Sequence, residues 1–278
     1  MTTTLAAPAA RTTTTTRTGF ATLMRAEWIS LTSLRGNTIS LIAGAFLLIA
    51  PAAGFAWLYG RDLQNAGGDL SQVPWVPGIA SLSSQGMMFA IAVAALVGAA
   101  SIAKEHSTGS LRTQLTAAPK RLSLICAKMT VVAITVFVST IVMLLVSFLA
   151  AYAVGAIYGM PVGIDNVFFD FILPTLGSAL FATAVAVFAL GLGAMLRSET
   201  WAVTLSLIFL YVAPMIIMQL PWSWAADVSD FLLFNTGGAL TMPITEFTSS
   251  YIVDIIVTIA WGAIAFFGGA AVMARKDA

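Results

Sequence analysis

Residues 39–58 read ISLIAGAFLLIAPAAGFAWL, a run of twenty residues without a charged side chain. A helix of about 20 apolar residues is long enough to cross the ~30 Å hydrocarbon core of a bilayer. The run is continuously apolar, whereas the strands of membrane barrels alternate between apolar and polar residues. This stretch therefore predicts a transmembrane helix, and the rest of the chain is interpreted from it.

The remaining sequence repeats this pattern. Five further apolar runs follow, at residues 85–103, 125–156, 171–196, 201–220 and 251–274. Hydrophobic residues make up 59 % of the 278 residues and charged residues only 9 %, whereas a soluble domain carries about 25 % charged residues. Inside lipid each segment must satisfy its own backbone polar groups, which favours helices. The sequence predicts an all-α integral membrane protein whose six transmembrane helices form a single domain over residues 19–278.

The basic residues are distributed unevenly along the chain. With six spans, Arg61 falls on one side of the membrane, and the other Lys and Arg residues share the opposite side with both termini: Arg11, Arg17, Arg25, Arg35, Lys104, Arg112, Lys120, Arg121, Lys128, Arg197, Arg275 and Lys276. Cytoplasmic loops carry an excess of Lys and Arg. We therefore expect both termini in the cytoplasm, in a multi-pass protein of the cell membrane.

The segment before the first span divides into two parts. Residues 1–18 are rich in Thr and Ala without apolar periodicity, which predicts a disordered tail. Residues 19–37 have apolar residues at near-helical spacing (Phe20, Leu23, Met24, Leu31 and Leu34), with Arg25, Glu27 and Arg35 elsewhere on the helical wheel. This pattern favours an amphipathic helix in the cytoplasmic interface of the membrane. The alternative is an extension of the first span.

Several kinds of chemistry are disfavoured by residues that the sequence lacks. No Gly-Lys pair exists, so the chain has no phosphate-binding loop of an ATPase. His106 is the single histidine, whereas a zinc peptidase motif needs two. The spans are nearly free of ionisable residues, and Asp254 lies near the external end of the last one. We expect no enzyme activity, no metal or cofactor on this chain and no nucleic-acid partner.

The loop after the second span, residues 104–121, reads KEHSTGSLRTQLTAAPKR. Leu111, Leu115 and Ala118 form an apolar stripe at helical spacing, and Pro119 discourages continuation of the helix. Lys120, Arg121 and Lys128 follow, where cations suit the helix dipole and the anionic leaflet. A short amphipathic helix without a core of its own suggests docking to another protein. The alternative is a solvated connecting loop.

These segments resemble type-2 ABC exporter permeases. The resemblance lies in Glu105-His-Ser-Thr-Gly109-Ser-Leu-Arg112 with Pro119, Arg121 and Lys128, and in Arg25-Ala-Glu27-Trp28 with Arg35 before the first span. The first set is similar to that family's first cytoplasmic loop, and the second set to its N-terminal interface helix. Ser110 stands where Thr is commoner. Six spans with both termini inside match the family topology, so the resemblance covers nearly the whole chain.

The resemblance implies a function for the chain as the permease subunit of an exporter. Two such subunits would form the translocation pathway, and a separate cytoplasmic ATPase, which binds ATP and Mg²⁺, would dock on the loop at 104–121. In this interpretation Leu111 and Leu115 seat the loop in the ATPase, while Glu105 and Arg112 contact it at the ends. Residues 221–247 would form an extracellular re-entrant gate, and the membrane would be the cytoplasmic membrane of a prokaryote.

Two other functions stay open at this point: an ATP-independent transporter or channel, and a membrane scaffold subunit. Small residues also suggest where helices approach closely, namely Gly191 and Gly193 in the fourth span and Gly268 and Gly269 in the sixth. We expect prolines at 51, 174 and 214 to kink the first, fourth and fifth spans.

Overall fold

The computed structural model describes residues 19–33, 35–68, 77–108 and 121–276, with the side chains of 103–108, 121–122 and 273–276 excepted. Over these residues the chain is helical and contains no strand. Six of its helical segments are long and apolar enough to cross a membrane: Arg35–Asn65, Ile79–Ile102, Ser123–Tyr158, Phe168–Leu196, Glu199–Met218 and Ser249–Val272. The predicted fold class of six membrane-crossing helices is thus confirmed.

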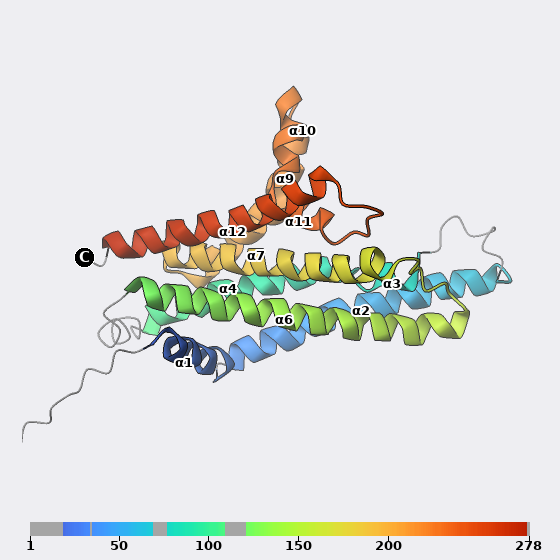
Figure 1. Ribbon diagram of the computed structural model, residues 1–278, viewed down its shortest axis with the longest axis horizontal. Coiled ribbons are helices and arrows are strands. Elements are labelled where there is room, and N and C mark those ends of the chain that lie inside the picture. Colours follow the sequence, from blue (N-terminus) through green and yellow to red (C-terminus); the bar gives the residue numbers. More distant parts are fainter. Residues whose placement is uncertain (1–18, 34, 69–76, 109–120, 277–278) are drawn as a thin grey trace, which may run out of the picture.

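The elements follow one another as an up-and-down bundle (Figure 1). The first half of the chain contains α1 (Phe20–Ser33), α2 (Arg35–Asn65), α3 (Ile79–Leu82), α4 (Met87–Thr108) and α6 (Arg121–Gly155). The second half contains η2 (Ala156–Tyr158), η3 (Phe168–Ile172), α7 (Leu173–Leu196), α8 (Glu199–Leu207), η4 (Ile208–Val212), α9 (Ala213–Met218), α10 (Ser223–Asp230), α11 (Leu233–Ala239) and α12 (Ser249–Lys276). α1 lies beside the bundle at the end where α4 finishes and α6 begins.

α7 is the central helix of the bundle and packs against α4, α6 and α12. In its span, 72 % of the most apolar 18 residues are buried, compared with 22 % in the span of α2. The outer helices therefore present apolar side chains outward, as expected for a protein whose surroundings are lipid. Soluble monomeric proteins rarely expose apolar surface on this scale.

Glycines allow α7 to touch its neighbours backbone to backbone. A Cβ added to Gly98 in α4 would lie 2.0 Å from the carbonyl oxygen of Ala186, and one added to Gly191 would lie 2.2 Å from that of Ala265 in α12. The predicted close approaches at Gly191, Gly193 and Gly269 are confirmed. The prediction for Gly268 is wrong, because a Cβ there meets only ordinary contacts with Met195, at 3.6 Å and beyond.

Two of the prolines follow wide helical turns. η3 is a π-helical turn that ends two residues before Pro174, and η4 is one that ends two residues before Pro214. A π turn changes the hydrogen-bonding register, so it accommodates a residue that lacks an N–H donor within a continuing helix. Pro51 instead stands inside α2 without a break in the helix.

The second predicted span begins earlier than expected, with a short helix and a turn. α3 is followed by turns at residues 83–86 before α4 begins. The hydroxyl of Ser147 on α6 donates to the carbonyl oxygen of Ser83 at 2.8 Å. Gly86 lies so close to α2 that an added Cβ would be 2.4 Å from the carbonyl oxygen of Leu47. Both neighbouring helices therefore hold this break in place.

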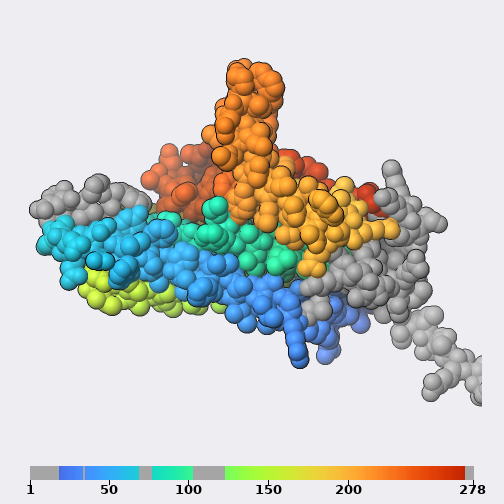
Figure 2. All heavy atoms as spheres, turned by 180° about the vertical axis from the view of Figure 1, so that it is seen from behind, coloured from blue at the N-terminus to red at the C-terminus, as the bar shows by residue number. Residues whose placement is uncertain are grey.

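The end of the fifth span and the segment that follows it leave the bundle sideways. α9 and α10 stand out from the other helices, as the orange projection in Figure 2 shows. Trp222 and Trp224 stack on each other there with ring centroids 5.1 Å apart, and both are about half exposed. α11 then returns to pack against α12 and α7. Residues 221–247, the predicted gate, thus contain the two short helices α10 and α11. Their role as a gate stays a prediction.

Candidate functional site

The predicted docking loop is bracketed by two of the long helices. Glu105 lies in the last turn of α4, and Arg121 is the first residue of α6. The structure describes only the backbone at these two positions. The other predicted loop residues lie outside the described part of the chain: Gly109, Leu111, Arg112, Leu115 and Pro119. The docking roles of all seven residues stay predictions.

The predicted interface residues lie on or just after α1. Arg25 and Arg35 are exposed, and Trp28 is 48 % exposed. Glu27, in contrast, is buried and 5 % exposed. α1 therefore has a buried face toward α6 that contains a carboxylate. The helical wheel had placed this residue away from the apolar stripe.

Glu27 forms a salt bridge with Lys128 of α6, whose amino group donates to the Glu27 Oε2. The side chains are 5 % and 7 % exposed, so both charges are shielded from solvent. A buried charge is tolerated only when it is paired and hydrogen-bonded. The expectation that Lys128 faces the anionic leaflet is wrong, because an acid on a helix 101 residues away neutralises it.

The salt bridge sits in a polar cluster between four helices. Ser30, Asn37 and Ser101 of α4 line the same small cavity as Glu27 and Lys128. The side-chain amide of Asn37 donates to the carbonyl oxygen of Leu31 at 3.3 Å, which ties the start of α2 to α1. Lys128 lies two helical turns after Arg121. The cluster thus fixes α1 against the part of α6 that follows the predicted docking loop.

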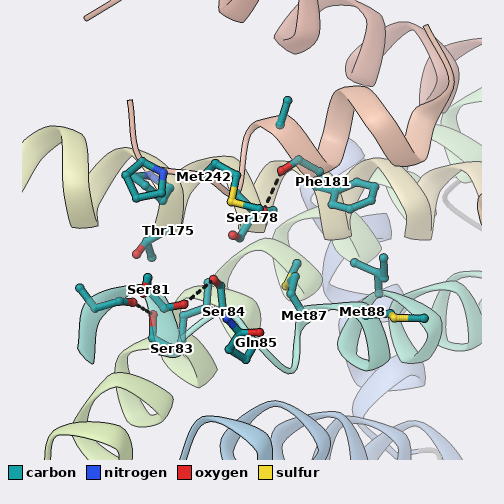
Figure 3. A pocket seen from close by; sticks show the side chains of 18 of the residues that line it. Ser81, Ser83, Ser84, Gln85, Met87, Met88, Thr175, Ser178, Phe181 and Met242 are labelled. Carbon is teal, nitrogen blue, oxygen red and sulfur yellow. Dashed lines mark hydrogen bonds between the residues drawn. The ribbon is translucent and has the colours of Figure 1, made fainter. Parts of the chain in front are cut away.

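A cavity of about 770 Å³ lies toward the opposite end of the bundle, between α3, α4, α7 and α11. Figure 3 shows the side chains of Ser81, Ser83, Ser84 and Gln85 on one wall and those of Thr175 and Ser178 on the other. The floor contains buried apolar residues, among them Met87, Ile91 and Phe181. Ligand pockets of about 300–1,000 Å³ that combine apolar walls with a few polar groups are typical binding sites.

Most polar groups of this cavity already donate within their own helices. Ser81 donates to the carbonyl oxygen of Gly78 at 2.8 Å, and Ser83 to that of Ala80 at 2.7 Å. Thr175 donates to the carbonyl oxygen of Phe171 at 2.7 Å. Because a hydroxyl oxygen keeps two lone pairs after donating, these groups present acceptors to the cavity.

The position of α3 is fixed by the loop that follows η2. The backbone N–H groups of Ile79 and Ala80 donate to the carbonyl oxygens of Pro161 and Val162, both at 3.0 Å. Asp170 lies at the start of the opposite wall, and its Oδ2 accepts the backbone N–H groups of Asp165 and Asn166. The cavity walls are therefore held by loops at the end of the bundle far from the termini.

Two features of these sites were missed by the sequence interpretation. The salt bridge between Glu27 and Lys128 leaves no local pattern in the sequence, because the two residues meet only through the packing of α1 against α6. The cavity had a visible signal, namely the polar run Ser81-Leu-Ser-Ser-Gln85 directly before an apolar helix. In the described residues, no group of three or more His, Cys, Asp or Glu side chains is placed to hold a metal ion.

Comparison with known proteins agrees with this architecture. Residues 12–266 match the family model described as ABC-2 family transporter protein. No curated protein matches the chain at a significant level. The family match covers all six membrane-crossing helices nearly completely and includes α1 and the predicted docking loop. This chain therefore belongs to the ABC-2 family of membrane transporter proteins.

Proposed function

We propose that this transporter chain is the permease subunit of an ATP-binding-cassette exporter. Two such subunits enclose the pathway, and a separate cytoplasmic ATPase docks on the segment 104–121 and drives it. The family match and the six-helix bundle support the permease role. The coupling between the ATPase and the pathway is supported mainly by one observation. The helices on both sides of this segment, α4 and α6, pack against the other helices of the bundle.

The charge distribution supports a cytoplasmic position for the docking segment. Basic residues gather at the end of the bundle where α1 lies: Lys104 near the end of α4, Arg121 at the start of α6 and Arg197 after α7. Among the described residues, Arg61 is the only Lys or Arg that lies toward the far end of the bundle. By the positive-inside rule, the end beside α1 faces the cytoplasm, together with both termini.

A force on the segment 109–120 has two direct routes into the bundle. α4 carries it through the backbone contact between Gly98 and Ala186 to the central helix. α6 carries it past Lys128, where the salt bridge to Glu27 joins α1 to the same movement. Packed helices shift as units rather than deform continuously. Closure of an ATPase pair thus changes the relative position of α4 and α6, which opens or closes the pathway.

The test is to place a charge on the apolar stripe of the docking segment. In membranes that contain the partner ATPase, Leu111→Asp and Leu115→Asp should reduce copurified ATPase and ATP-dependent transport about tenfold or more, because an unpaired carboxylate is costly to bury. Thr113→Asp, which adds the same charge off the stripe, is the matched control. Membrane insertion of all three variants should equal that of the wild type.

The results separate this function from its alternatives. Normal ATPase binding and transport in both Leu variants would refute the docking role. Transport by the purified chain under an ion gradient alone would indicate an ATP-independent transporter. Absence of transport with any ATPase, in protein that inserts normally, would indicate a scaffold.

A further inference from the structure

The hydroxyl of Ser178 is the unusual group of the large cavity. Ser178 is 1 % exposed, and its Oγ is a buried side-chain atom without a hydrogen-bond partner in the described part of the protein. Thr175 and Thr183 on the same helix both donate to carbonyl oxygens one turn earlier, at 2.7 Å. Buried hydroxyls are nearly always hydrogen-bonded, so an unmatched one points to a partner that the chain does not supply.

The side chain of Ser178 projects from α7 toward the wall formed by α3 and the start of α4 (Figure 3). On that wall Ser81 and Ser84 line the cavity and donate to their own helix or turn, so each hydroxyl oxygen keeps lone pairs that can accept a further hydrogen bond. A ligand between the walls thus meets one hydroxyl with an unused donor and several acceptors. This set suits hydroxyl or amide groups, which both donate and accept.

The described lining of the cavity contains few groups that could stabilise a charged ligand. Within the part of the chain that the structure describes, Asp170 is the single ionisable residue of the lining. One of its carboxylate oxygens already accepts two backbone N–H groups. No Lys, Arg or His is found among the described residues that line the walls. Moving a phosphate or carboxylate into this site is unfavourable because nothing compensates its lost hydration. The buried Met87, Leu144 and Phe181 favour an apolar body instead.

We propose that this cavity binds an uncharged amphiphile and that such molecules are the exported cargo. The apolar body packs on the methionine and phenylalanine side chains, and a hydroxyl- or amide-bearing end bonds with Ser178 and the serines of the opposite wall. The volume of about 770 Å³ accommodates one ligand of drug or single-chain lipid size. The inference rests on the proposed export function and names its cargo by chemical class.

Binding is tested with the full-length protein in phosphatidylcholine nanodiscs. The probe is a monoacylglycerol with a photoactivatable diazirine in its chain, and the matched probe is a lysophosphatidic acid with the same chain. The neutral probe should label peptides of α3, α4 and α7, and the anionic probe should label them about tenfold less. Ser178→Ala should weaken the neutral probe about three- to tenfold, the effect of one lost hydrogen bond.

Two further variants keep the result interpretable. Ser206→Ala removes another buried hydroxyl, which donates to Ala202 within α8 far from the cavity, and should leave labelling unchanged. Met242→Trp narrows the cavity from its rim, where Met242 is 63 % exposed, and should reduce labelling without disturbing the core. Equal labelling by both probes, or unchanged labelling in Ser178→Ala and Met242→Trp, overturns the proposal.

Transport of the same neutral probe is then measured in inside-out vesicles that contain the partner ATPase. ATP-driven uptake that falls in Ser178→Ala in parallel with binding supports a cargo site. Binding that falls while uptake is unchanged overturns the cargo assignment. A wild-type protein that binds the probe but shows no ATP-dependent uptake of any compound contradicts the proposed export function instead, so the two failures are distinguishable.

Discussion

The buried salt bridge between Glu27 and Lys128 makes a quantitative prediction. Both side chains are nearly inaccessible, at 5 % and 7 % exposure. Removal of one member of a buried pair leaves an uncompensated charge and destabilises a protein by about 3–5 kcal/mol. Glu27→Gln and Lys128→Met should each lower the free energy of unfolding by this amount. The two substitutions change size little, so the loss of charge dominates.

The double variant Glu27→Gln/Lys128→Met should recover most of the loss. With both charges removed, no buried ion is left without its counter-ion, and replacement of a buried ion pair by uncharged groups is often close to neutral. The amide introduced at position 27 is polar and needs a hydrogen-bond partner in the cluster, which accounts for a remaining loss. We expect the double variant within about 1–2 kcal/mol of the wild type. The double variant should therefore lose much less stability than the sum of the losses of the two single variants, and this difference is the coupling energy between the two side chains.

Cys126 supplies the assay, because it is the only cysteine of the chain and lies half-buried two residues before Lys128. Its rate of thiol labelling across a denaturant series reports the opening of α6 beneath α1. Arg25→Gln, which removes an exposed charge from α1, is the control and should change stability by no more than about 0.5 kcal/mol. Single variants as stable as this control, or a double variant whose loss is the sum of the singles, would refute the reasoning.

Two further perturbations test the packing. Gly98→Ala should destabilise the bundle by about 1–3 kcal/mol or more, because its Cβ would lie 2.0 Å from the carbonyl oxygen of Ala186; thermal unfolding of detergent-solubilised protein measures this. Gly54→Ala in α2, where nothing lies within 4 Å of an added Cβ, should be neutral or slightly stabilising. Ser147→Ala should cost about 0.5–1.5 kcal/mol by loss of its hydrogen bond to the Ser83 carbonyl. Ser139→Ala, which loses only a bond within α6, should cost less in the same melting experiment.

The membrane-crossing helices follow from the sequence because lipid imposes a simple constraint. A run such as residues 39–58 has no polar group to bury elsewhere, so length and apolarity are sufficient to predict the helix. The ends are less predictable. The α2 helix continues to Asn65, past Arg61, because an arginine at the far end of the bundle no longer lies in the apolar zone.

Sites made of contacts between distant segments were not predictable in the same way. Glu27 and Lys128 carry ordinary charges in sequence, and only the packing of α1 on α6 turns them into a buried pair. The break before α4 needs the hydroxyl of Ser147, from 64 residues further along the chain, to satisfy the carbonyl of Ser83. Ser178 stands in an apolar run whose other hydroxyls bond within the helix, so its missing partner shows only in three dimensions.

The glycine contacts of α7 have a mechanical consequence for transport. Gly98 and Gly191 bring peptide backbones together without an intervening side chain, so no rotamer change can absorb a shift between these helices. α4, α7 and α12 therefore behave as one rigid body over the length of these contacts. In the proposed exporter, alternating access would then require shear between this group of helices and its surroundings: α2 with α6 on one flank, and the segment from α8 to α10 on the other. The π turn at η4 lies within that second flank, and turns of this kind within α-helices occur frequently at functional sites.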